Sequence, residues 1–117
     1  MTRLLPTGLL VSALLRRVND AGGMGMVRAK GDPDSGSILL ILNDGSGPGR
    51  MVERAIGPLG TYALVATGPT DAPDDLAGAP ARDAYWQRRR ARDPDLWVIE
   101  LDIASAERFA AETILDG

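Results

Sequence analysis

Five consecutive apolar residues at 38–42 (Ile-Leu-Leu-Ile-Leu) constrain the fold of this chain more than any other feature. They lie between two segments rich in turn-forming residues, 31–36 (Gly-Asp-Pro-Asp-Ser-Gly) and 44–49 (Asp-Gly-Ser-Gly-Pro-Gly). A short apolar run between such breakers is typical of a β-strand buried on both faces. We therefore expect a central strand at 37–43, in a sheet that helices cover on both sides.

The residue types present limit the chemistry that the chain can perform. Its 117 residues suffice for one ordinary domain, and apolar residues make up 44 %, enough for a hydrophobic core. The absence of Cys and His excludes disulfides, thiol nucleophiles, imidazole catalysis and Cys/His zinc sites. An enzyme would depend on carboxylates, Arg, Ser, Thr, Tyr or the single lysine, Lys30. The composition favours a non-catalytic protein without excluding an enzyme, and it predicts no catalytic residue, cofactor or metal.

Charge and the N-terminal segment bear on partners and location. The formal net charge of −3 argues against nucleic acid or an anionic membrane as the main partner. Arg3 and the apolar residues after it resemble the start of a signal peptide, but Arg16 and Arg17 follow directly, without a small-residue cleavage site. The apolar run is also far shorter than the ~20 residues that span a bilayer. We expect a soluble, cytoplasmic protein.

Helical and alternating apolar spacing divides the chain into eight elements. Helices are expected at 9–21, 83–92 and 106–115, the last capped by Ser105, and strands at 24–30, 37–43, 50–56, 61–67 and 96–103. The segment 68–81 carries three prolines and three aspartates and predicts an exposed loop. The order α-β-β-β-β-α-β-α indicates a single α+β domain over 1–117, with about five strands in a mostly antiparallel or mixed sheet and helices on both faces. The loop at 31–36 predicts that 24–30 and 37–43 pair as a hairpin.

Four segments in this order and spacing suggest a family. They are 11–17 (Val-Ser-Ala-Leu-Leu-Arg-Arg), 22–23 (Gly-Gly), 30–36 (Lys-Gly-Asp-Pro-Asp-Ser-Gly) and 92–100 (Arg-Asp-Pro-Asp-Leu-Trp-Val-Ile-Glu). Together they resemble a family of small bacterial proteins catalogued as domain of unknown function fourteen-ninety-one, over roughly 9–102. The sequence departs from that family's pattern at Leu10, where an aromatic residue is usual. The resemblance implies no activity, cofactor or catalytic residue.

The acidic loop at 31–36 contains Asp32 and Asp34. A calcium loop beginning at Asp32 would need a Glu at its twelfth position, where Asn43 stands, so we interpret the segment as a turn in which the aspartates cap backbone N–H groups. Three cations accompany this loop in the segments that carry the resemblance: Arg16, Arg17 and Lys30. Two interpretations stay open: a structural ion pair between one of the arginines and one of the aspartates, or a polar loop pocket for a small anion.

The expected helix at 83–92 lies in a basic segment. Its arginines, with one just before it, are Arg82, Arg88, Arg89, Arg90 and Arg92. Arginines next to Tyr85 and Trp86 are suited to bind a small anion or single-stranded nucleic acid. The alternative is a solvated helix face whose charges meet Asp83, Asp93 and Asp95. Both aromatic residues and Arg89 are expected to face inward, and the other arginines of the helix to be solvated.

No assembled catalytic set emerges, so we predict a non-catalytic binding or regulatory module that acts through protein contacts and self-association. An unpaired sheet edge, or the helix that carries Tyr85 and Trp86, is the expected interface. The alternative is a small-anion or nucleotide-binding protein, or an enzyme, that uses Arg and Asp residues; its anion-binding candidates are Arg16, Arg17, Lys30, Arg88, Arg89 and Arg90. A third possibility is nucleic-acid binding through the Arg-rich helix at 82–92. Glu100 and Asp102 share one strand face, which we interpret as exposed.

Overall fold

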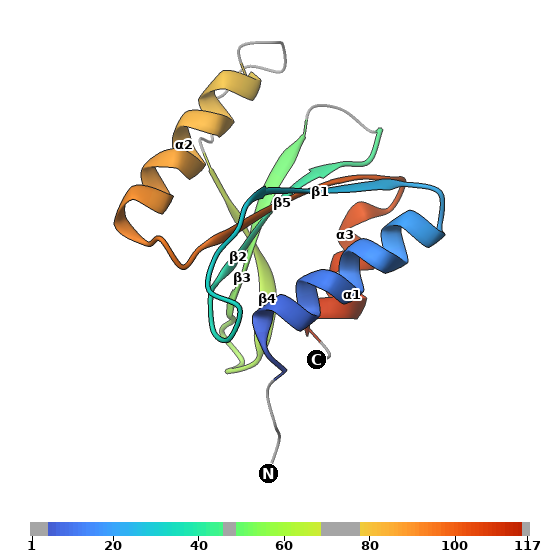
Figure 1. Ribbon diagram of the computed structural model, residues 1–117, viewed down its shortest axis with the longest axis horizontal. Coiled ribbons are helices and arrows are strands. Elements are labelled where there is room, and N and C mark those ends of the chain that lie inside the picture. The colour runs from blue at the N-terminus through green and yellow to red at the C-terminus, as the bar shows by residue number, and fades with distance from the viewer. Residues whose placement is uncertain (1–4, 46–48, 69–77, 116–117) are drawn as a thin grey trace.

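The apolar run at 38–42 forms strand β2 (Ile38–Asn43), which lies in the middle of a five-stranded sheet (Figure 1). The computed structural model describes residues 5–45, 49–68 and 78–115. The other strands are β1 (Met24–Ala29), β3 (Arg50–Ile56), β4 (Tyr62–Thr67) and β5 (Trp97–Asp102), and the sheet order is β1-β5-β2-β3-β4. None of the five apolar side chains of β2 is more than 4 % exposed. The prediction of a central strand buried on both faces is confirmed.

Strand pairing makes the sheet mixed. β2 runs parallel to β5 and antiparallel to β3, while β1 and β4 pair antiparallel at the two edges. The predicted hairpin between 24–30 and 37–43 is wrong, because β5 lies between β1 and β2. Burial explains the difference: β5 is almost as buried as β2, whereas most of β1 is exposed. The two most buried strands pair in the centre, and β1 takes an edge.

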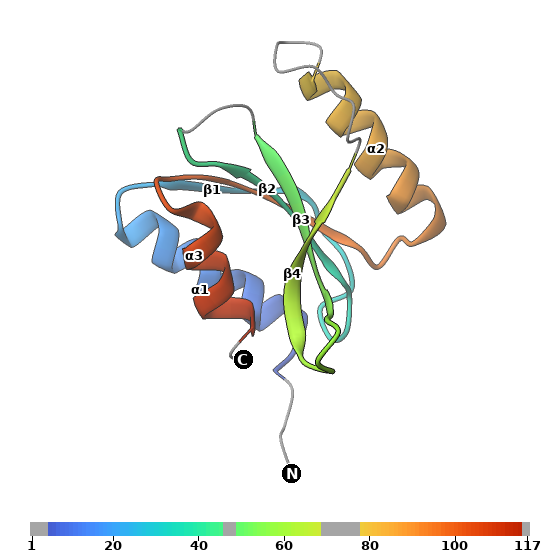
Figure 2. The same ribbon diagram turned by 180° about the vertical axis from the view of Figure 1, so that it is seen from behind.

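Three helices cover the two faces of the sheet. Helix α1 (Thr7–Asp20) lies beside helix α3 (Ala106–Ala110), which continues as the π-helical segment η1 (Ala111–Leu115); together they cover what we call the first face. Figure 2 shows the same arrangement from behind, with α2 (Gly78–Arg92) projecting on the other side. Helix α2 packs on the opposite face, which we call the second face. The predicted α+β fold with helices on both faces is confirmed.

Each face has its own hydrophobic core. The core of the first face contains Leu10, Val11, Leu14, Val18, Ile38, Leu40, Leu42, Val52, Trp97, Ile99, Leu101, Ala106, Ala110 and Ile114. The smaller core of the second face contains Ala29, Leu39, Ile41, Met51, Leu96 and Val98, with Tyr85 and Trp86 of α2 packed against it. Successive residues of β2 alternate between the two cores, as the two-residue period of a strand requires.

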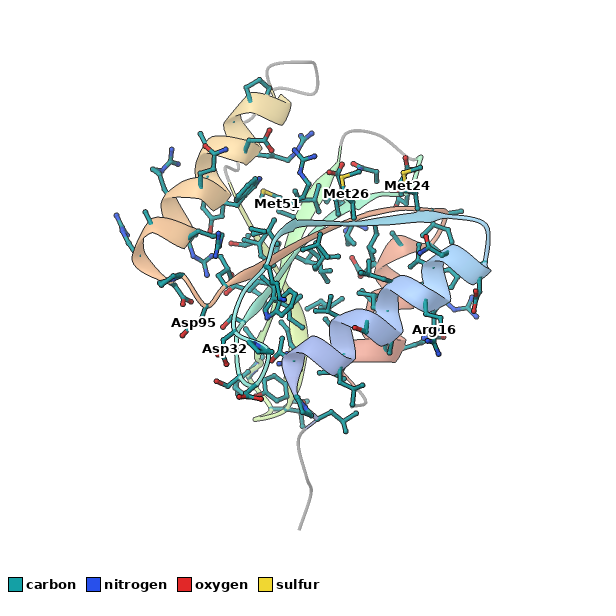
Figure 3. The ribbon with its side chains drawn as sticks, viewed as in Figure 1. Arg16, Met24, Met26, Asp32, Met51 and Asp95 are labelled. Carbon is teal, nitrogen blue, oxygen red and sulfur yellow. The ribbon has the colours of Figure 1, made fainter. Side chains whose placement is uncertain are left out.

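The two Asp-Pro-Asp turns at 32–34 and 93–95 lie side by side. They precede β2 and β5, and because these strands are parallel neighbours, their starts meet at the same end of the sheet. The Asp32 N–H donates to the Asp95 carbonyl at 3.0 Å, and Figure 3 shows the two residues close together. A side chain in place of Gly31 or Gly36 would overlap that same carbonyl. Glycine at these two positions therefore allows the turns to approach.

The start of helix α2 and the cap of helix α3 differ from the prediction. Helix α2 begins at Gly78, five residues before the expected start at Asp83, so the predicted loop at 68–81 is shorter. Pro80 explains the error, because proline is tolerated in the first turn of a helix, where its missing N–H has no partner to lose. The rest of that loop, 69–77, lies outside the described residues. Ser105 does precede α3, but its backbone is left-handed and its side chain forms no capping bond.

Candidate functional site

An ion pair joins α2 to the second face of the sheet. The guanidinium of Arg89 donates to both carboxylate oxygens of Glu53 in β3, each at 2.8 Å, and to the Tyr85 hydroxyl at 3.1 Å. That hydroxyl lies 2.6 Å from Thr67 Oγ1 in β4. The hydrogen bonds with Glu53 raise the pKa of Arg89 above its usual range, so its charge is permanent. Burial alone raises the pKa of Tyr85, but hydrogen bonds with Thr67 and Arg89 outweigh it, and the net pKa is lowered.

Arg90 holds the C-terminal end of α2. Its guanidinium donates to the carbonyl of Leu96 at 3.1 Å, of Lys30 at 3.0 Å and of Pro94 at 2.9 Å. These carbonyls come from the segment after β1 and from the turn before β5. The prediction that Arg90 is solvated is therefore wrong, because three backbone acceptors converge where this side chain ends. Arg89 faces inward, as predicted.

A small hollow lies beside this ion pair. Its volume is about 110 Å³, and its lining consists of Tyr85, Arg88, Arg89 and Arg92. Arg88 and Arg92 are exposed, as predicted, and neither forms a hydrogen bond or ion pair with any residue that the structure describes. The predicted pairing of the helix arginines with neighbouring aspartates is thus wrong for Arg89, which pairs with a strand residue, and for Arg90, which binds carbonyls.

A second polar group lies on the same face, toward β1. Asn43 donates to the Glu100 carboxylate at 2.7 Å, and the other oxygen of Glu100 lies 3.7 Å from Arg28. Arg28 is also 4.0 Å from Asp83, whose carboxylate accepts a hydrogen bond from Trp86 at 3.1 Å. The interpretation of Glu100 as an exposed strand residue is wrong, since it is half-buried and bonded. The predicted interface residues Tyr85 and Trp86 are themselves half-buried against the sheet.

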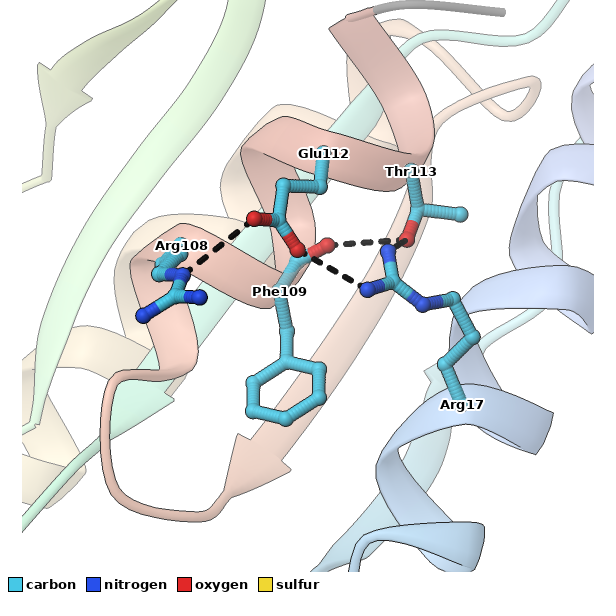
Figure 4. A network of polar contacts seen from close by, with 5 residues as sticks. All are labelled: Arg17, Arg108, Phe109, Glu112 and Thr113. Atoms are coloured by element: carbon cyan, nitrogen blue, oxygen red, sulfur yellow. Dashed lines mark hydrogen bonds and ion pairs between the residues drawn. The ribbon is translucent and has the colours of Figure 1, made fainter.

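Arg17 lies at the opposite end of helix α1 from the acidic loop. Figure 4 shows its guanidinium donating to Thr113 at 2.7 Å and to Glu112 at 2.8 Å, and it lies 5.5 Å from the Phe109 ring centre. The hydrogen bonds from Arg17 and Arg108 lower the pKa of Glu112. The suggested ion pair of Arg17 with the loop aspartates is wrong. Ten residues of helix, about 15 Å, separate it from the first turn of α1, which the loop contacts.

The acidic loop binds α1 through its backbone. The N–H groups of Thr7 and Gly8 donate to the carbonyls of Asp34 and Pro33, at 3.2 and 2.8 Å. The Asp32 carboxylate accepts bonds from the Asp34 and Ser35 N–H groups and from the Ser35 hydroxyl, and the Ser35 N–H in particular lowers the pKa of Asp32. The predicted capping turn is confirmed for Asp32. The Asp34 side chain forms no bond within the described part of the chain.

The set of Arg16, Arg17, Lys30, Asp32 and Asp34 is not brought together as one pocket. Arg16 is exposed on α1, and Lys30 contributes its carbonyl to Arg90. Figure 3 shows Arg16 on α1, away from Asp32. Across 5–45, 49–68 and 78–115, no three carboxylates are close enough to hold a metal ion, and no helix is long and apolar enough to cross a membrane.

Glu53 is the site residue that the sequence interpretation missed. The sequence does contain a signal, because strand alternation puts Glu53 on the same face as Met51, which is buried. A carboxylate beside a buried methionine needs a cation from the covering layer. Arg89 was the one helix arginine expected to face inward, so the pair could have been predicted from these two residues.

Strand β1 is an edge strand that exposes three large apolar side chains. Met24, Met26 and Val27 are all exposed, and β1 pairs with no described strand other than β5. Met24 and Met26 pair with Asp102 and Glu100, so they lie on the second face and point away from α1 (Figure 3). Val27 pairs with Ile99 and lies on the first face. Both sides of this edge therefore carry apolar groups.

These features define an α+β domain with a five-stranded mixed sheet, two helical segments on one face and an arginine-anchored helix on the other. The chain belongs to the family described as protein of unknown function (DUF1491), whose model matches residues 5–111. This confirms the family suggested by the sequence. No curated protein matches the chain.

Solved structures show the same fold. The chain is similar to a DUF1491 family protein from Caulobacter crescentus CB15 determined by crystallography, with 30 % identity and a TM-score of 0.72 over 91 % of this chain and 94 % of the other. It is also similar to a DUF1491 family protein from the same organism determined by NMR, with 29 % identity and a TM-score of 0.71 over 92 % of this chain and 94 % of the other. Protein Atu0922 from A. tumefaciens gives 25 % identity, a TM-score of 0.62 and 86 % coverage of each chain.

Proposed function

We propose that this protein is a non-catalytic binding or regulatory module of the cytoplasm that acts through protein contacts, and that its first contact is with a second copy of itself along β1. The observation that carries the proposal is the edge formed by Met24, Met26 and Val27, whose side chains are exposed and beside which no described strand lies on the outer side. Exposed hydrophobic edge strands are open to pairing with another chain, and proteins that must stay monomeric protect them with charges, prolines or covering segments.

An antiparallel pair of β1 strands about a twofold axis fits this edge. Centred near Met26, such a pair would place Met24 and Met26 of both copies on one face of a continuous sheet. In such an isologous contact the same surface of both copies forms the interface, so a single apolar edge is sufficient to form a dimer. The other edge, β4, offers a comparison, because its central valine, Val65, is exposed to a similar extent.

Size-exclusion chromatography with light scattering tests the proposal. Wild-type protein is expected to have twice the chain mass of 12.4 kDa at high concentration and to dissociate on dilution. Lysine in place of Val27 (41 % exposed) is expected to give a monomer, because it removes one of the three exposed apolar side chains and adds a cation beside Arg28, which ion-pairs within its own chain. The matched control is Val65→Lys on β4 (44 % exposed), which should remain dimeric.

Two results contradict the proposal. A wild-type mass of 12.4 kDa at every concentration excludes self-association. A dimer that survives Val27→Lys but dissociates in Val65→Lys assigns the interface to β4 instead. Because both valines are exposed, neither substitution is expected to unfold the protein, and circular dichroism checks this.

A further inference from the structure

The hollow on α2 is lined by three guanidinium groups and one phenol, with no carboxylate among its lining residues. Tyr85, Arg88, Arg89 and Arg92 occupy positions i, i+3, i+4 and i+7, so they form one stripe along the helix. Like charges four residues apart on a helix repel one another. The stripe therefore concentrates positive charge, at a cost to the helix, in a chain whose net charge is −3.

Two of these four side chains are held in fixed positions. Both carboxylate oxygens of Glu53 bind Arg89 at 2.8 Å, and the Tyr85 hydroxyl is bound by Thr67 at 2.6 Å and by Arg89 at 3.1 Å. These contacts come from two different strands, β3 and β4. They make the inner side of the hollow a rigid surface that presents hydrogen-bonding groups.

The other two side chains have no such partners. Arg88 and Arg92 are exposed, and neither forms a hydrogen bond or ion pair with a described residue. Their neighbours Arg89 and Arg90 are occupied by Glu53 and by three carbonyls. Two guanidinium groups, one helical turn apart, thus line one hollow without a partner among the described residues.

We infer that this hollow binds a single phosphate group, either inorganic phosphate or the phosphate of a small phosphomonoester. Arg88 and Arg92 donate to the phosphate oxygens, while Arg89 and Tyr85 form the inner wall. The planar fork of arginine matches phosphate oxygens, and two guanidinium groups balance the charge of a dianion. The volume of about 110 Å³ is well below the about 300 Å³ at which pockets begin to enclose whole small molecules. The anionic group enters the hollow and the rest of the ligand stays outside.

NMR titration of the full-length protein with inorganic phosphate, and separately with adenosine monophosphate, tests the inference. Saturable shifts of the resonances of 85–92 are expected with at least one of the two, and the tighter ligand identifies the source of the phosphate. The double variant Arg88→Gln/Arg92→Gln is expected to weaken that binding by about tenfold or more, since each arginine contributes charge-assisted bonds. Neither side chain has a partner among the residues that the structure describes, so this variant should keep its fold.

The matched control removes the same charge elsewhere. Arg16→Gln/Lys30→Gln deletes two exposed cations outside the hollow and should leave the dissociation constant unchanged within about twofold, because long-range effects are screened by salt. Equal weakening in both double variants means a diffuse charge effect and overturns the inference. The inference is also overturned if neither ligand gives saturable shifts. It is equally overturned if a single-stranded oligonucleotide binds and the two small phosphates do not. None of these outcomes bears on β1, so this site and the proposed self-association are tested independently.

Discussion

Leu39 and Leu40 are adjacent in β2 and equally buried, yet they lie in different surroundings. Leu40 faces α1 and α3 in the core of the first face, and its partner on β3 is Val52. Leu39 faces α2, and its partner on β3 is Glu53, the carboxylate that binds Arg89. The first face is closed by a large hydrophobic core with ion pairs at its rim, while the second face combines a small core with hydrogen-bonded charges.

This difference separates stability from function in the molecule. Hydrophobic packing is non-directional and scales with area, so the first face gains stability without presenting specific groups to solvent. Hydrogen-bonded charges are directional, so Glu53 fixes the position of Arg89 and, through it, of α2. The hollow and most of the apolar β1 edge accordingly lie on or beside the second face. We expect substitutions in the hydrophobic core of the first face to lower the free energy of unfolding more than equivalent substitutions in the core of the second.

The largest effect on stability is expected from truncating the adjacent leucines of β2, Leu39 and Leu40. Leu40→Ala should lower the free energy of unfolding by about 4–5 kcal/mol and Leu39→Ala by about 2–3 kcal/mol, both within the usual range for buried leucine. The reason is that a cavity under two helical segments cannot collapse, whereas the single helix on the second face can shift toward the space. Urea denaturation measures both values. Equal losses, or a larger loss for Leu39→Ala, would show that the two faces are equally rigid.

A smaller effect is expected from the arginines of α2, where neighbours differ in role. Arg89→Gln should cost about 1–3 kcal/mol, because it leaves a half-buried Glu53 without its charged partner. Arg88→Gln should stay within about 0.5 kcal/mol, as exposed substitutions without partners usually do. Urea denaturation with both variants measures the contrast. If the two variants are equally stable, the ion pair does not hold α2 and the second face depends on its apolar contacts.

Much of the first face could be predicted from the sequence. The run at 38–42 and the helical stripe of Leu10, Leu14 and Val18 are continuous patterns, and such patterns predict which side of an element is buried. The order of strands could not be predicted in the same way. The loop at 31–36 suggested a local hairpin, but β2 pairs with β5 from far along the chain, because pairing the two most buried strands outweighs proximity in sequence.

The second face was less accessible to prediction, for a different reason. Which polar side chains bind one another depends on where their ends lie in the folded protein. A single charged residue, unlike a run of apolar residues, shows no sequence periodicity from which its position could be predicted. The same limit applies to Arg17 at the rim of the first face: its helix position was predicted, but its partner Glu112 comes from a segment whose packing on α1 is a tertiary feature. Arg89 is a partial exception, since the helical spacing predicted that it faces inward, although its partner Glu53 was not predicted.

The smallest effect is expected at the rim of the first face, where acid should remove the contribution of Glu112. Hydrogen bonds from Arg17 and Arg108 lower the pKa of this carboxylate in the folded protein, whereas the unfolded chain titrates near the ordinary value of about 4.3. The unfolded state therefore binds more protons between these two values, and the stabilisation is lost as pH falls through the folded pKa. At pH 7 the melting temperature of the wild type should be higher than that of Glu112→Gln. This difference in melting temperature should disappear as the pH is lowered.

Melting temperatures of wild type, Glu112→Gln, Arg17→Ala and the double variant across this pH range measure the coupling between the two side chains. About 1 M salt should also reduce the gap at pH 7, because both groups are exposed and the screening length falls to about 3 Å. The same salt should leave the Arg89→Gln difference largely intact, since that pair is more buried. A gap that widens in acid would contradict the assigned direction of the pKa shift. If salt reduces the melting-temperature differences of Glu112→Gln and Arg89→Gln equally, the Arg89–Glu53 pair is no more sheltered from solvent than the Arg17–Glu112 pair.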